Sequence, residues 1–164
     1  MGKFIALLLI GGSIVMSSAA TPKVNENAEL LAISMIAKYE GFSATPYKCP
    51  GGYLTIGYGF ADPILVARGV ISRKDADYEL GKIVRKNLAL LRKHVSGLTP
   101  KQEAASVSLM YNIGNGAFLK STYLQKLKSK DFVAARTEIK KWNHSNGRVL
   151  DGLTKRRAAE AAWI

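Results

Sequence analysis

The chain contains 164 residues, a length typical of one globular domain, and its 48% apolar and 22% charged residues exclude a disordered or low-complexity protein. Its 24 Lys and Arg against 12 Asp and Glu give a formal charge of +12, which favours an anionic polymer or surface as a partner. A single cysteine, Cys49, excludes an intrachain disulfide, and with only two histidines the chain has no zinc-ligand pattern.

Residues 1–20 form an apolar segment with a single charge, Lys3. The segment ends in Ser18-Ala19-Ala20, small residues of the kind that signal peptidase recognises. As a helix, its uncharged run would extend about 25 Å, less than the roughly 30 Å hydrocarbon core of a bilayer. The segment therefore predicts export, either as a cleaved signal peptide or as a weak anchor, with residues 21–164 as one domain. A buried N-terminal helix of a cytosolic protein is the alternative.

The first element predicted after this segment is a helix over residues 28–40, which has a broad apolar face and ends before Gly41. Strand-forming residues follow over 47–60, and a turn at 50–52 divides them. This pattern predicts a small β-hairpin directly after the helix.

The rest of the chain has the capping and periodic patterns of helices. Ser72 and Asp75 form a capping pattern before a long helix that reaches about residue 93, and Thr99 begins a helix that reaches Ile113. Three further short helices are expected to begin at Ser121, Asp131 and Thr154. The fold class is therefore α+β, with one early hairpin lobe and a larger helical lobe.

Glu40 is the first candidate for chemistry, because it lies where the helix meets the hairpin. Burial beside aromatic side chains would raise its pKa and keep it protonated, as a general acid requires. Cys49 and Thr55 lie on the hairpin, where they are expected to face Glu40 across a cleft. The simpler interpretations are a solvated Glu at a helix end, a small buried hydrophobe for Cys49 and a strand former for Thr55.

Residues 40–59 resemble the active-site segment of the phage-type lysozymes, glycoside hydrolase family 24. The later landmarks of that family follow in the same order, so the resemblance covers residues 28 to 164. They are Leu98-Thr99-Pro100-Lys101-Gln102, Tyr111-Asn112-Ile113-Gly114, Phe118, Ser121, Thr122, Trp142, Gly152-Leu153, Arg156, Arg157 and Glu160.

This resemblance implies a lysozyme-like fold with a cleft between a small N-terminal β-hairpin lobe and a larger helical lobe. It also implies a monomeric endolysin that cleaves the β-1,4 bond between N-acetylmuramic acid and N-acetylglucosamine in peptidoglycan and causes cell lysis. Neither a metal nor an organic cofactor is expected. No nucleic acid is expected as a partner either, since no binding motif appears and the export segment argues against one.

The family acts through a Glu, an Asp nine residues later and a Thr six residues beyond that. This chain has Glu40, Cys49 and Thr55 at those positions, so the spacing is kept and a thiol replaces the middle carboxylate. Some exported phage endolysins that the chain resembles have the same Cys. The resemblance implies that Glu40 is the general acid and that Cys49 and Thr55 place a water molecule. A second departure is Phe60, where many relatives have His.

Two alternatives accompany the resemblance. A wall-binding relative that has lost turnover would keep the cleft, and the Cys49 replacement motivates this possibility. Residues 1–20 are either cleaved or kept as a releasable anchor that holds an inactive enzyme at the inner membrane before its release into the periplasm.

The remaining landmarks are expected to be scaffold. Trp142 is interpreted as a core residue, and Tyr111-Asn112-Ile113-Gly114 as a helix end that serves capping or packing rather than sugar binding. Arg156 and Glu160 lie four residues apart at helical spacing, with Arg157 beside them, which predicts a solvated or structural ion pair.

Overall fold

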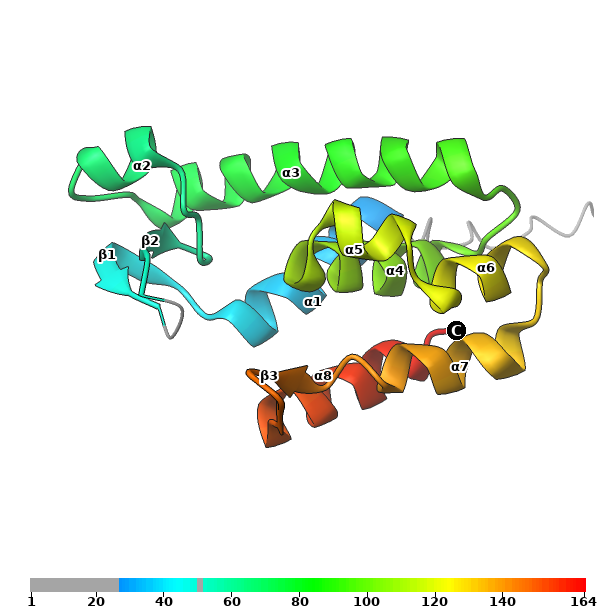
Figure 1. Cartoon of the computed structure of the whole chain (residues 1–164). Helices are drawn as coiled ribbons and strands as arrows, with labels where there is room; N and C mark the ends of the chain where they lie inside the picture. The colour runs from blue at the N-terminus through cyan, green and yellow to red at the C-terminus, as the bar shows by residue number, and fades with distance from the viewer. Residues whose placement is uncertain (1–26, 50–51) are drawn as a thin grey trace, which may run out of the picture.

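The computed structural model describes residues 27–49 and 52–164 (Figure 1), so the predictions for residues 1–20 and for the centre of the hairpin turn lie outside the described residues. Within these ranges, every helix is too short or too polar to cross a bilayer. The helices of the described part are α1 (Ala28–Glu40), α2 (Pro63–Ala67), α3 (Arg73–His94), α4 (Pro100–Ile113), α5 (Asn115–Leu119), α6 (Thr122–Lys128), α7 (Phe132–Lys140) and α8 (Asp151–Ala161). The strands are β1 (Ser43–Lys48), β2 (Leu54–Gly57), β3 (His144–Ser145) and β4 (Arg148–Val149).

Helix α1 ends at Glu40, as the sequence predicts, because the chain turns at Gly41. Gly41 has φ 69°, a left-handed conformation that suits glycine, and its N–H donates to the carbonyl of Ala37. Strand β1 follows at once, four residues earlier than predicted, and pairs antiparallel with β2. In this register Tyr47 lies opposite Thr55. The predicted α+β hairpin lobe is confirmed.

The capping patterns of the helical lobe locate α3 and α4 correctly. The Ser72 hydroxyl accepts from the N–H of Asp75, and Thr99 forms a reciprocal capping box with Gln102. The expected cap at Thr154 is wrong, because α8 begins at Asp151. The Thr154 hydroxyl lies inside the helix and donates to the carbonyl of Leu150.

Strands β3 and β4, of two residues each, form a second hairpin that was not predicted from the sequence. Asn146 (φ 50°) and Gly147 (φ 74°) both have positive φ and connect the two strands. An Asn-Gly pair is the strongest short-range signal for this kind of turn. The signal was therefore present in the sequence.

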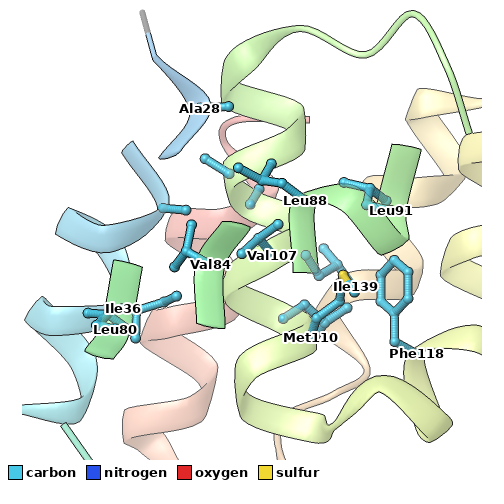
Figure 2. Close-up of a cluster of buried hydrophobic side chains, with 14 of the residues drawn as sticks. Ala28, Ile36, Leu80, Val84, Leu88, Leu91, Val107, Met110, Phe118 and Ile139 are labelled. Carbon is cyan, nitrogen blue, oxygen red and sulfur yellow. The ribbon is translucent and has the colours of Figure 1, made fainter. Parts of the chain in front are cut away.

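The core lies mainly in the helical lobe, around α4, whose residues from Ala104 to Met110 are all buried. Helices α1, α3, α5 and α8 contact α4, and α3 extends from the hairpin lobe along the helical lobe (Figure 1). Figure 2 shows side chains from α1, α3 and α4 meeting in one cluster that includes Ile36, Val84 and Val107. Trp142 packs against this core, which confirms its interpretation. The rigid helical packing holds the end of α1, and with it Glu40, against the hairpin lobe.

Candidate active site

Glu40 is held at the junction of the two lobes by a guanidinium group from the other end of the chain. Its Oε1 accepts a hydrogen bond from Nη1 of Arg156 on α8 at 2.6 Å. The side chain of Glu40 is 22% exposed and that of Arg156 only 3%. Aromatic residues lie beside this carboxyl, as expected, since Phe42 and Tyr47 line the same cavity as Glu40, but its direct hydrogen-bond partner is a buried cation that the sequence did not predict.

The second carboxylate oxygen of Glu40 faces the hairpin lobe. A Cβ atom placed on Gly59 would lie 3.6 Å from Glu40 Oε2 and 3.9 Å from the hydroxyl of Tyr47. Gly59 has φ +85°, a conformation that favours glycine, so its backbone lies close to Oε2 with no side chain between them. A separate cavity of about 290 Å³ is lined by Glu40, Gly41, Phe42, Ser43 and Tyr47.

The two hairpin candidates are positioned by the β1–β2 register. Thr55 is buried, lies opposite Tyr47 and donates from its hydroxyl to the Tyr47 carbonyl at 3.4 Å. Cys49 is half-buried just beyond β1, and its N–H donates to the carbonyl of Tyr53. Alternation along the pleat puts Tyr47, Cys49 and Thr55 on one face of the hairpin. Between Glu40 and either candidate, no hydrogen bond occurs within the described residues, so the roles of Cys49 and Thr55 stay predictions.

Arg156 belongs to a buried network of four charged side chains. Its Nη2 donates to the carbonyl and hydroxyl of Ser108, and its Nε donates to Glu160 Oε1 at 3.2 Å. The Ser108 hydroxyl donates to the same Glu160 oxygen at 2.6 Å. Arg157 completes the network, with its Nε 2.8 Å from Glu160 Oε2. The solvated alternative for these residues is therefore wrong, and the structural ion pair is present and extends to Glu40.

Burial changes the acid–base behaviour of this network. It raises the pKa of Glu160, while the guanidinium groups of Arg157 and Arg156 and the Ser108 hydroxyl act in the opposite direction. Burial also lowers the pKa of Arg157 to about 10, so this side chain is still a cation at neutral pH. The network thus holds two guanidinium groups and two carboxyl groups in a largely dry environment.

A groove of about 630 Å³ lies between the two lobes, and Glu40 is not among the residues that line it. Gly59 connects the groove to Glu40, because it lines the groove and its backbone also lies close to Glu40 Oε2. Tyr111 lines the groove as well and donates from its hydroxyl to the Tyr58 carbonyl at 2.8 Å. Burial, and then the charge of Glu40, raise the pKa of Tyr111, so it stays neutral. The other lining residues are Phe60, Ala61, Asp62, Leu65, Glu79, Lys82, Ile83, Lys86, Asn87, Met110, Gly114 and Asn115.

Two sequence interpretations are refined by this groove. Gly114 caps α4 through its N–H to the Met110 carbonyl, as expected, and together with Tyr111 it also lines the groove. Phe60, which stands where many relatives have His, is buried against Tyr58 at a ring-centroid distance of 6.2 Å.

Across the described ranges, no three His, Cys, Asp or Glu side chains are grouped so as to hold a metal ion.

The chain is similar to phage proteins over most of its length. Residues 37–160 match the sequence profile of the Phage lysozyme family. The endolysin of Acyrthosiphon pisum secondary endosymbiont phage 1 is 38% identical over 133 residues, which are 78% of this chain and 90% of that protein. The SAR-endolysin of Enterobacteria phage P21 is 26% identical over 96% of this chain and 91% of its own length. The chain spans only about half of the endolysin of Bacillus phage B103, to which it is 36% identical over 82% of its own length.

Solved structures agree with this similarity. An endolysin from Escherichia coli O157:H7 phage FAHEc1 superposes with a TM-score of 0.71 at 27% identity, covering 81% of this chain and 89% of that one. A single-residue mutant of P22 lysozyme superposes with a TM-score of 0.70 at 27% identity, covering 80% and 93%. The overall fold is thus shared with these proteins.

Proposed function

The chain belongs to the phage lysozyme family, and from this premise we propose that Glu40 is the general acid of a muramidase that lyses bacteria. The substrate is peptidoglycan, and the bond cleaved is the β-1,4 linkage between N-acetylmuramic acid and N-acetylglucosamine. The observation that carries the proposal is the partly exposed carboxyl group of Glu40 at the junction of two lobes, where it lines a cavity of about 290 Å³ and lies beside Gly59, a residue of the groove between the lobes. The alternative of a wall-binding protein without turnover is not favoured, because the relatives are endolysins.

The two oxygens of Glu40 have different surroundings, which supports an assignment of roles. Oε1 accepts from Arg156, while Oε2 lies toward Gly59, which also lines the groove. The proton that Glu40 transfers therefore lies on Oε2, and it passes to the glycosidic oxygen as the bond to the ring carbon breaks. Water attacks the opposite face of that carbon, which inverts its configuration; the proton that the water gives up passes to solvent, and Glu40 takes up a proton from solvent before the next cycle. Cys49 and Thr55 on the hairpin place this water.

The groove is suited to a glycan chain. Its volume lies within the range of about 300–1,000 Å³ that is typical of ligand sites. Apolar side chains such as Ile83 and Met110 offer surface to the faces of sugar rings, and the Asn115 amide, which donates to Asn87 at 3.1 Å, offers polar groups. The net positive charge of the chain further attracts an anionic cell wall.

Purified peptidoglycan provides the direct test of the proposed reaction. The full chain is expected to lower the turbidity of a peptidoglycan suspension and to release new reducing ends, with the α-anomer formed first. Release of peptides without reducing sugars, or clearance without any new chain ends, would contradict a muramidase.

Substitutions of Cys49 test its proposed role. Cys49→Ser keeps a small polar group and is expected to retain turnover within about tenfold of the parent, since water placement is one part of a catalytic contribution of about 10² to 10⁴. Cys49→Asp is expected to be tolerated, because the family places Asp at this position. Cys49→Ala is the control without a polar group. Initial rates of reducing-end release compare the three, and a lower rate for Cys49→Asp than for Cys49→Ala would contradict the role.

For residues 1–20 we infer export to the periplasm, with the segment first retained as an anchor in the inner membrane. The similarity to the SAR-endolysin of phage P21, which covers 96% of this chain, supports this inference. N-terminal sequencing of the protein released from the membrane is expected to start at the original N-terminus. A start at Thr21 would contradict the anchor, and protein found only in the cytoplasm would contradict export.

A further inference from the structure

Glu160 is a buried carboxyl group that is not among the residues lining the groove, yet it is hydrogen-bonded to the residue that holds Glu40. Its relative exposure is 0%, and its contacts are Ser108, Arg156 and Arg157. We propose that Glu160 is a positioning residue, which directs Arg156 onto Glu40 and offsets the second buried cation. This inference rests on the proposed function of Glu40 as the general acid.

The geometry of the guanidinium group supports the positioning role. The group is planar and rigid, so fixing two of its nitrogens determines the direction of the third. Nε of Arg156 is bound by Glu160, and Nη2 is bound by the carbonyl and hydroxyl of Ser108. The remaining nitrogen, Nη1, then points at Glu40 Oε1. Glu160 thus determines which oxygen of Glu40 is occupied and which is free for substrate.

The balance of buried charges supports the proposal that Glu160 offsets the second buried cation, Arg157. Arg156 and Arg157, both on α8, are balanced by Glu40 and Glu160. Other titratable groups near this network are Tyr123 on α6 near Glu160, and Tyr111 on α4 and Tyr47 on β1 near Glu40. The Tyr39 ring on α1 lies 5.6 Å from the Arg156 guanidinium, and the Cys49 thiol is on the same hairpin face as Tyr47. Burial raises the pKa of Tyr123 and of Tyr111, so neither of them adds charge near neutral pH.

Removing the charge of Glu160 would leave two buried cations beside a single carboxyl group. Excess positive charge favours the ionised form of a carboxyl group. Glu40 would therefore lose its proton at a lower pH, and activity would fall earlier on the alkaline side of the pH–rate profile. A purely structural role for Glu160 would lower activity at every pH without moving this limb.

The experiment compares pH profiles of kcat/KM on purified peptidoglycan for the full chain and Glu160→Gln, which preserves size and hydrogen-bond acceptance. The alkaline limb is expected to shift to lower pH by about one unit. At pH values above the limb, kcat/KM is then roughly tenfold lower than in the parent, and at pH values below the limb it is unchanged. The matched control is Glu103→Gln, because Glu103 pairs with Arg92 at 2.7 Å on the surface of the same lobe. This control is expected to leave the limb in place.

Arg157→Met provides an independent test, because it is expected to shift the alkaline limb in the opposite direction. If Glu160→Gln does not fold, this variant tests the inference by itself. Loss of this cation is expected to move the limb to higher pH, and the double variant is expected to restore the parent position. The inference is overturned if the alkaline limb does not move in the folded single variants. It is also overturned if Glu160→Gln and Arg157→Met shift the limb in the same direction. If Glu40→Gln is inactive while the limb does not move, only this inference fails. An active Glu40→Gln overturns the proposed function instead.

Discussion

Glu40→Gln is expected to reduce turnover of peptidoglycan by about 10² to 10⁴-fold, the usual contribution of a general acid. The amide has nearly the same shape as the carboxyl group, and its oxygen still accepts from Arg156, so the fold and the groove should be retained. It has no acidic proton to give to the glycosidic oxygen. Reducing-end release from purified peptidoglycan measures the loss, and circular dichroism confirms that the variant is folded.

Glu29→Gln is the matched control for this prediction. Glu29 lies on the same helix, pairs with Arg85 at 2.6 Å and is 26% exposed, but it lies near the first turn of α1 instead of its last residue. Its substitution is expected to leave turnover unchanged. If Glu40→Gln still cleared peptidoglycan at the parent rate, the assignment would be wrong. If it still lysed cells without cleaving sugar bonds, lysis would come from the effect of a cationic chain on membranes.

Arg156→Met is expected to have the largest effect on stability. Removing one partner of a buried ion pair typically costs about 3–5 kcal/mol, because the other charge is left buried without compensation. Here Glu40, Glu160 and Ser108 would all lose a donor. Urea denaturation followed by circular dichroism measures the free energy of unfolding. Turnover should fall as well, since Glu40 is no longer held.

Arg92→Met is the control for the burial argument. Arg92 makes two hydrogen bonds to Glu103 at 2.7 Å, but it is 56% exposed. Exposed pairs of this kind contribute roughly 0.2–1 kcal/mol, because water screens both charges. An equal loss of stability in the two variants would show that burial does not determine the importance of Arg156. Arg156→Lys is not expected to rescue stability, because an ammonium group cannot reproduce the planar set of donors.

The ends of the main helices could be predicted because they depend on neighbours in the sequence. Ser72 and Thr99 cap α3 and α4 through N–H groups within three residues, and Gly41 ends α1 through its own backbone conformation. The failure at Thr154 has the same local origin, because a hydroxyl in the first turns of a helix can bond backward as easily as it can cap. The order of the motifs was sufficient to predict the family, which the comparisons confirmed.

The sequence by itself determined the α+β fold, the family, and the placement of Glu40 at the junction of a helix and a hairpin. Only the tertiary structure decided that Arg156 reaches Glu40 across 116 positions, and that Arg157 and Glu160 are buried instead of solvated. The physical reason is that caps, turns and periodicity act over a few residues, whereas the burial of a charge depends on partners that packing brings from other elements. The same spacing of Arg156 and Glu160 on an exposed helix would have formed an ordinary surface pair.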